Sequence, residues 1–360
     1  MIPEITYSAD GRIKIDWSDY DERVGPLFDG SAFTKGDRKG IPVEKFYLPF
    51  FEGWPTALAS NYDYDGMEKK TKETISHHAL QAPSLDEALT SEYMQRFSSM
   101  VDEFRKHFTE KGWDRTEFQF YLNNKWHWDG ASSWWNLDEP MSYDDWEALK
   151  FFGSIFRKPG AMTPDNFVFR ADISRPRWQH DWLNGILDKM YVQDRAFYDN
   201  PGRVRQLKKE GRISFSIYGS LNNIESSNQQ TVLWCMSAFV EGADGVLPWQ
   251  SLGNSKALTV PDRNALIVDV ADVMDIDWIA SLRVNALRRC QQNVELLAML
   301  ENKYSYKREQ IRDFYYGYFK KEIKSHGLKT KGEFSDRLVG VNTAKIENFR
   351  KILIDMLSSN

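Results

Sequence analysis

The chain has 360 residues, of which 41% are hydrophobic and 28% are charged, and its formal net charge is -5 at pH 7. This composition supports a sizeable buried core and excludes wholesale disorder, and the length suits one large α/β barrel or two ordinary domains. The acidic balance argues against nucleic acid or an anionic membrane as a partner, because such binding usually requires a clustered basic surface. A neutral substrate fits these numbers better.

Strand-like and helix-like patterns alternate along most of the sequence, which is typical of parallel βαβ units. The first clear strand covers 43–50, and apolar residues at helical spacing predict a helix over 90–112. The next strand covers 117–124. A further helix is expected to begin at Ser142, because Asp145 follows it at the spacing of a capping box.

The alternation continues to about residue 270 and then gives way to a long helical pattern. Further strands are expected over 166–173, 189–193, 212–219, 245–250 and 264–270, and further helices over 178–188, 200–211, 228–242 and onward from 277. These segments bring the number of convincing strands to seven. A short run near the N-terminus, 4–8 or 12–17, is a candidate for an eighth. We therefore predict a closed (β/α)8 barrel of the TIM type.

A doubly wound open sheet is the alternative fold, and it normally carries a glycine-rich nucleotide-binding turn after its first strand. The sequence contains neither G-x-G-x-x-G nor G-x-x-x-x-G-K, so we favour the barrel and expect no cofactor. Beyond about residue 302 the sequence is basic, aromatic and helical. We assign 1–300 to the barrel and 301–360 to a C-terminal helical extension packed on it, with a separate small domain as the alternative.

Cys235 and Cys290 lie in helix-like segments far apart in the sequence, a pattern that gives neither a disulfide framework nor the spacing of metal ligands. We predict that both are buried as small apolar side chains and that no metal is bound. No apolar run approaches the roughly 18 residues that span a bilayer, and the N-terminus lacks the apolar core of a signal peptide. Cytoplasmic expression and secretion after removal of a leader are both compatible with this sequence, and the oligomeric state is open.

In a barrel, chemistry comes from the carboxyl ends of the strands and from the loops that follow them. The segment 126–149, WHWDGASSWWNLDEPMSYDDWEAL, combines five tryptophans with an adjacent acid pair, Asp138 and Glu139. Two carboxylates held close together cannot both ionise freely, so one pKa rises and that group can donate a proton near neutral pH. Alternatively, these acids simply precede a helix, whose macrodipole favours negative charge there.

The chain has 13 tryptophans, and several fall at strand ends or in loops, where no periodicity requires a large apolar side chain. Flat rings with a polar edge suit the C–H faces and hydroxyls of a sugar. The alternative is that these rings pack a loop onto the barrel rim. We predict a carbohydrate site whose candidate binding residues are Trp54, Asn123, Trp126, His127, Asp172, Tyr218, Trp249 and Gln250.

The segment 135–157, which contains the Asp-Glu-Pro triplet before a helix, resembles glycoside hydrolase family 123 and its uncharacterised relatives. Their barrels carry the same adjacent pair before proline. Segments 10–30, 169–174, 234–250 and 281–300 are similar to other parts of the family in the same order. The resemblance therefore covers roughly residues 10 to 300.

This resemblance implies hydrolysis of a 2-acetamido sugar, with β-N-acetylgalactosaminides as the substrate class, by substrate-assisted retention. Glu139 would protonate the leaving oxygen and then activate water, while Asp138 would orient the acetamido group that attacks the anomeric carbon. The implied partner is an oligosaccharide or glycoconjugate. Two alternatives stay open: Glu139 acting with a distant carboxylate, Asp172 or Glu52, on an ordinary glycoside, and a non-catalytic carbohydrate-binding protein.

Overall fold

A computed structural model describes residues 3–8, 12–50, 52, 84–122, 135–157, 166–211, 213–219, 227–260, 265–319 and 341–359. Two compact units make up the chain, residues 1–190 with 210–213 and residues 191–209 with 214–360. Among the helices of the described ranges, none combines the length and apolar character that crossing a bilayer requires.

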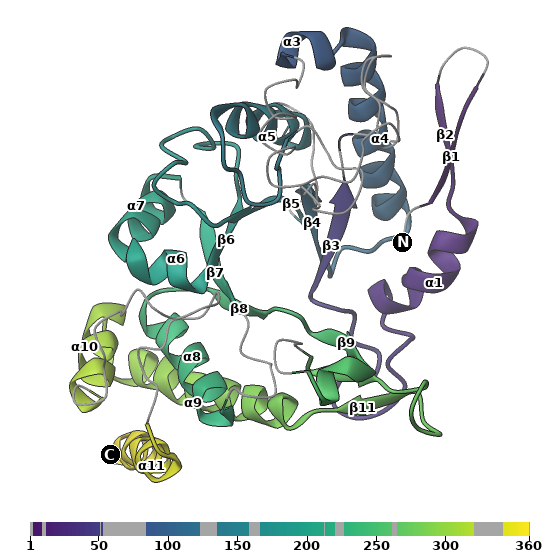
Figure 1. The fold of residues 1–360 in the computed structure, drawn as a ribbon. Coiled ribbons are helices and arrows are strands. Elements are labelled where there is room, and N and C mark those ends of the chain that lie inside the picture. Colours follow the sequence, from purple (N-terminus) through teal and green to yellow (C-terminus); the bar gives the residue numbers. More distant parts are fainter. Residues whose placement is uncertain are drawn as a thin grey trace. The chain divides into compact units, whose positions relative to one another are not determined.

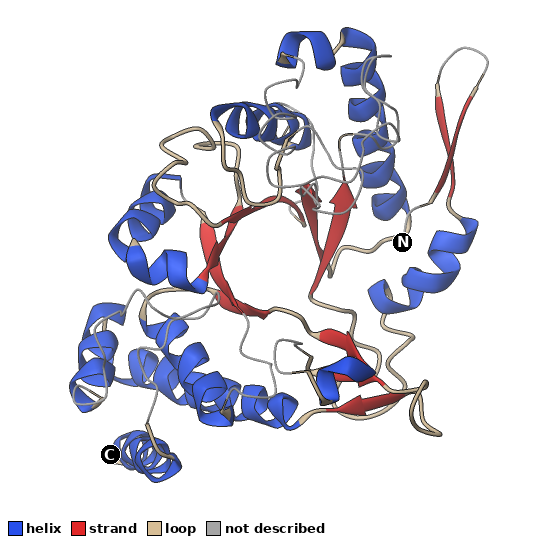
Figure 2. Ribbon diagram, in the orientation of Figure 1, coloured by secondary structure: helices blue, strands red, loops and turns tan. Residues whose placement is uncertain are grey.

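The mixed α/β fold is built on a sheet to which the described residues contribute six strands, in the order β3-β4-β5-β6-β7-β8 (Figure 2). These strands are β3 Lys45–Phe50, β4 Glu117–Leu122, β5 Phe167–Ile173, β6 Lys189–Gln193, β7 Ser214–Gly219 and β8 Gly245–Pro248. The pairs β3–β4, β4–β5 and β7–β8 are parallel. All six segments were predicted as strands, but a closed barrel of eight strands is not confirmed.

The two remaining strand predictions correspond to strands that join other sheets. The segment 264–270 gives β10 (Ile267–Asp269), and the N-terminal segments give β1 (Glu4–Tyr7) and β2 (Ile13–Asp16). β10 lies between β9 (Leu252–Asn254) and β11 (Trp278–Ala280) in a three-stranded sheet, while β1 and β2 pair with each other as an antiparallel hairpin. A short apolar run indicates that a strand exists, but long-range packing decides which sheet it joins.

The sheet of the first unit is covered on one face by an aromatic core. In the described residues of this unit the helices are α1 (Ser18–Phe28), α3 (Leu85–Ala88), α4 (Ser91–Glu110) and α5 (Tyr143–Phe156) (Figure 1). Alternate residues of a strand point to opposite faces. In β4, Phe118 and Phe120 are fully buried, and Phe120 stacks on Phe156 of α5 with ring centroids 4.7 Å apart. Gln119 and Tyr121 therefore point to the other face of the sheet.

Two local features fix where α5 begins and how closely it packs. Ser142 caps the helix by accepting a hydrogen bond from Asp145 N, and the reciprocal bond completes the predicted capping box. Further along, Gly153 brings the helix against β5. A Cβ atom at Gly153 would lie 2.5 Å from both Phe169 and Ile186, so no side chain fits between helix and strand.

The predicted helix over 178–188 is wrong, because this segment forms a series of turns. Two of its residues have left-handed backbone conformations, His180 with φ of 46° and Gly185 with φ of 77°. Either conformation interrupts a right-handed helix. The apolar spacing that suggested a helix instead places Leu183 and Leu187 in the core, where both are buried.

The second unit has a helical core. Its helices are α6 Asp194–Asp199, α7 Pro201–Gly211, α8 Asn228–Val240, α9 Leu282–Tyr304, α10 Arg308–Tyr318 and α11 Thr343–Ser358, and a 3-10 turn covers Ser255–Leu258 (Figure 1). α8 to α11 share one hydrophobic cluster, with Tyr315 and Phe349 fully buried in it. The segment beyond 302 is therefore helical in the described ranges, as predicted. The proposed division at residue 300 stays a prediction.

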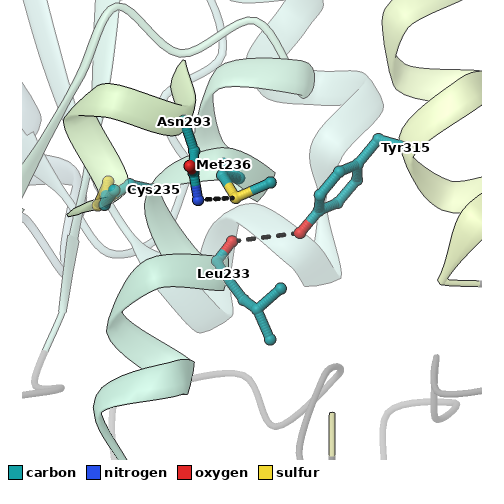
Figure 3. The surroundings of a disulfide bond; sticks show 6 residues. Leu233, Cys235, Met236, Asn293 and Tyr315 are labelled. Carbon is teal, nitrogen blue, oxygen red and sulfur yellow. Dashed lines mark hydrogen bonds between the residues drawn. A yellow bond between two sulfur atoms is a disulfide. The ribbon is translucent and has the colours of Figure 1, made fainter. Parts of the chain in front are cut away.

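Cys235 of α8 and Cys290 of α9 form a disulfide, with their Cα atoms 5.9 Å apart (Figure 3). The prediction that both residues are buried is confirmed, with 5% and 2% of their surfaces exposed, but the prediction of unbonded thiols is wrong. Their separation of 55 positions in the sequence gave no indication of pairing, because α8 and α9 come together only through tertiary packing. Nearby, Tyr315 donates a hydrogen bond to the carbonyl of Leu233 over 3.4 Å.

Arg105 of α4 places a cation inside the aromatic core of the first unit. Its guanidinium carbon lies 5.0 Å from the ring centroid of Phe120, and it donates a hydrogen bond to the carbonyl of Phe156. Two of its nitrogens, Nε and Nη1, have no hydrogen-bond partner among the described residues. Burial lowers the pKa of Arg105 to about 10.

Replacing Arg105 by Met is expected to leave the free energy of unfolding unchanged or to raise it by about 1 kcal/mol, because a buried charge gives way to an apolar chain of similar length. Urea unfolding at pH 7 measures this change. The matched control is Arg96→Met on the same helix, where the side chain is 34% exposed. A loss above about 2 kcal/mol at position 105 would mean that the cation-π contacts outweigh the desolvation cost.

Candidate active site

The loop that carries the acid pair is fastened at both ends by one side chain. Asp145, in the first turn of α5, accepts a hydrogen bond on Oδ1 from Asn136 N at 2.9 Å. Its Oδ2 accepts bonds from Met141 N and Ser142 N, both at 2.8 Å. The side chain is buried, and this burial raises the pKa of Asp145 although the N–H donors oppose the shift. The backbone around Asp138 and Glu139 is thereby fixed.

Within this loop the two acids have different environments. Asp138 is buried, with 7% of its surface exposed, whereas Glu139 is partly exposed. Glu139 has a φ of 69°, a left-handed conformation that is uncommon for a residue with a side chain. The side-chain amide of Asn136 donates a hydrogen bond to the Glu139 carbonyl at 2.8 Å and so supports this conformation. The two consecutive acids thus differ in burial, with Asp138 buried and Glu139 partly exposed.

Tyr121, near the carboxyl end of β4, joins Asp138 to Asp172 of β5. Its hydroxyl lies 2.7 Å from Asp138 Oδ1 and 3.3 Å from Asp172 Oδ2, which places these carboxylate oxygens at most 6.0 Å apart. Burial, followed by the charges of Asp172 and Asp138, raises the pKa of Tyr121 well above its usual range. The phenol therefore stays protonated at neutral pH and acts as a hydrogen-bond donor.

Arg170 binds the second of these carboxylates with two hydrogen bonds. Its Nε lies 2.9 Å from Asp172 Oδ1, and its Nη2 lies 3.0 Å from Asp172 Oδ2. The guanidinium carbon also lies 4.4 Å from the ring centroid of Tyr121, its partner in the β4–β5 register. All three side chains are buried. A bidentate ion pair of this kind fixes the orientation of the carboxylate.

Replacing Asp145 by Ala is expected to lower the free energy of unfolding by about 3 kcal/mol, because three backbone N–H groups lose a charged acceptor. Turnover should fall with it, since both ends of the acid loop are released. Thermal unfolding and an initial-rate assay measure the two effects. The neighbouring Asp144→Ala, at an exposed position of the same helix turn, should change neither; equal losses at both positions would refute the anchoring role.

The structure describes some of the predicted binding residues and not others. Asp172 lies beside Asp138, both in contact with Tyr121. Tyr218, Trp249 and Gln250 belong to the second unit, where Tyr218 is buried at the end of β7 and Trp249 follows β8 with 48% of its surface exposed. Trp54, Asn123, Trp126 and His127 lie outside the described residues. Their roles stay predictions.

Three residues that hold the acid pair were not singled out from the sequence in this role. Tyr121 and Asn136 contact the pair directly, and Asp145 had been interpreted only as a helix cap. One signal for Tyr121 was present: the strand EFQFYL alternates buried Phe with Gln and Tyr, which indicates a polar face opposite the core.

No protein-family model and no curated protein matches the sequence. Among solved structures, the fold is similar to that of a family 123 glycoside hydrolase from Clostridium perfringens, which was analysed for glycolipid glycan hydrolysis. The two chains share a fold. Their TM-score is 0.62 at 12% sequence identity, and the match covers 99% of this chain but 58% of the other. This chain thus spans little more than half the length of the enzyme that it resembles.

Proposed function

We propose that the protein is a glycoside hydrolase that cleaves N-acetylhexosaminides, with β-N-acetylgalactosaminides as the preferred class, by substrate-assisted retention. The observation that carries this proposal is the contrast between the two adjacent acids: Asp138 is buried and receives a hydrogen bond from Tyr121, while Glu139 is partly exposed. The fold shared with a family 123 glycoside hydrolase supports the same reaction class.

In the first step, Glu139 donates a proton to the glycosidic oxygen as the bond from that oxygen to the anomeric carbon breaks. The carbonyl oxygen of the 2-acetamido group attacks the anomeric carbon from the opposite face and closes an oxazolinium ring. Asp138 accepts the hydrogen bond of the acetamido N–H and stabilises the positive charge that develops there. In the second step, Glu139 takes a proton from water, which attacks the anomeric carbon and reopens the ring with net retention.

The same geometry disfavours a mechanism in which Asp172 acts as the nucleophile or base. Both oxygens of Asp172 accept hydrogen bonds from Arg170, and one of them also lies near the Tyr121 hydroxyl. Both oxygens of the carboxylate are therefore already engaged by neighbouring donors, which leaves fewer lone pairs free to attack a carbon or to accept a proton from water. Asp172 therefore suits a supporting role, in contact with Tyr121 and Arg170.

A screen of chromogenic β-N-acetylgalactosaminide, β-N-acetylglucosaminide, β-galactoside and β-glucoside tests the proposal. We expect turnover of the acetamido sugars alone, with the galactosaminide cleaved fastest. Proton NMR of the first product formed should show the β-anomer. An initial α-anomer, or equal turnover of the plain hexosides, would overturn the assisted mechanism, and sugar binding without turnover of any substrate would favour the carbohydrate-binding alternative.

A further inference from the structure

A chain of polar contacts runs along the face of β4 and β5 opposite the aromatic core and ends at Asp138. At its far end Lys189 of β6 lies 3.0 Å from Glu117, which accepts a hydrogen bond from Gln119 at 2.8 Å. Gln119 in turn accepts a hydrogen bond from Arg170 at 3.5 Å. Each side chain in this row contacts the next by a hydrogen bond or an ion pair, so each restrains its neighbour.

The last contact in this row is the hydrogen bond between Tyr121 and Asp138, and its donor can be assigned. Tyr121 has a single proton, and two carboxylate oxygens lie within reach of its hydroxyl. Asp172 already accepts two hydrogen bonds from Arg170, and its oxygen is the more distant of the two, at 3.3 Å against 2.7 Å for Asp138. The proton of Tyr121 is therefore donated to Asp138.

This bond has two physical consequences for Asp138. With Oδ1 held by Tyr121, rotation of the carboxylate is restricted, so the direction of Oδ2 is set as well. The donor also stabilises the charged form of a buried carboxylate that lies close to a second anion, Asp172. Without the hydroxyl, Asp138 would lose this donor while the Asp172 carboxylate remains nearby.

We propose that Tyr121, clamped by the Arg170–Asp172 pair, is the positioning residue that keeps Asp138 charged and correctly oriented toward the acetamido group. The inference rests on the proposed function for the role of Asp138. Tyr121 makes no contact with the substrate in this proposal and acts through Asp138. Substituting Tyr121 should therefore change the kinetics in the same way as substituting Asp138, and not as substituting Glu139.

The first test compares Tyr121→Phe with Glu139→Gln on two N-acetylgalactosaminides, one with a nitrophenyl and one with a dinitrophenyl leaving group. We expect kcat of Tyr121→Phe to fall about 10- to 100-fold on both with KM little changed, as for loss of a hydrogen bond to a charged group. In kcat/KM, which reports the first step alone, Glu139→Gln should recover on the dinitrophenyl substrate, because that leaving group needs no proton. Tyr121→Phe should not recover, since its defect lies in the attack by the acetamido group.

Tyr20→Phe is the matched control. Tyr20 is buried in the same unit, and its hydroxyl has no hydrogen-bond partner among the described residues. This variant removes the same atom from a comparable environment and should leave kcat and KM unchanged. If Tyr121→Phe behaves like Tyr20→Phe, or recovers on the dinitrophenyl substrate as Glu139→Gln does, the inference is overturned.

A second measurement needs no substrate and separates this inference from the proposed function. The carboxyl carbon of Asp138, assigned by its loss in Asp138→Asn, is followed by NMR through a pH titration of protein with labelled aspartate. In Tyr121→Phe it should titrate at a higher pH than in the native chain, because the carboxylate has lost a hydrogen-bond donor. If no glycoside is cleaved, the proposed function fails; a shifted titration would then still support the role of Tyr121, and an unshifted one would overturn it.

Discussion

Replacing Asp138 by Asn is expected to lower kcat on an N-acetylgalactosaminide by about 10²- to 10³-fold, the usual cost of removing a group that stabilises charge in the transition state. The amide no longer supplies the negative charge that balances the forming oxazolinium. On a matched substrate without the acetamido group, where any residual turnover follows another route, the change should be small. Initial rates on the two substrates measure this difference directly.

The control for this experiment is Asp144→Asn, which makes the same chemical change at an exposed position of the first turn of α5. It should leave both rates unaltered. An equal loss of rate on both substrates in Asp138→Asn would count against the assisted mechanism. It would favour a mechanism in which Asp138 also takes part in hydrolysis of glycosides that lack the acetamido group. Unfolding midpoints of both variants would distinguish a loss of catalytic rate from a loss of folded protein.

Replacing Cys235 and Cys290 by Ala is expected to lower the free energy of unfolding by about 4 kcal/mol, because the disulfide closes a loop of 55 residues in the unfolded chain. Urea unfolding without reductant measures this loss. Either single substitution should cost about as much as the double one, since each breaks the same bond. The decisive control is titration of free thiols in the unsubstituted chain after denaturation. Two reactive thiols per chain would refute the disulfide.

Local sequence signals predicted helices and strands well where interactions between residues near each other in the chain decide the structure. The start of α5 followed from the capping pair Ser142 and Asp145, and β6 followed from a buried run bounded by polar residues. The predicted helix over 178–188 failed because apolar spacing does not reveal left-handed backbone at residues such as His180. Sheet membership and closure were also beyond the sequence, because both depend on partners far apart in the chain.

The residues of the candidate site were likewise predicted where a local signal exists and missed where only tertiary contacts bring them together. Asp138 and Glu139 were found because adjacent acids before a proline are conspicuous in any sequence. Tyr121 was missed, because its two partners lie 17 and 51 residues away: Asp172 meets it only when β4 and β5 pair, and Asp138 only when the loop before α5 is in place. The Cys235–Cys290 bond escaped prediction for the same reason, since two buried helices must pack before the sulfur atoms meet.

Gly153 has a practical consequence for engineering this chain. Its missing side chain lets α5 rest against Phe169, and the same helix carries Asp145, the anchor of the acid loop, at its other end. A library that randomises position 153 would therefore displace the helix and the acid loop, with no change at Asp138 or Glu139. Mutagenesis aimed at altered specificity should leave this codon untouched.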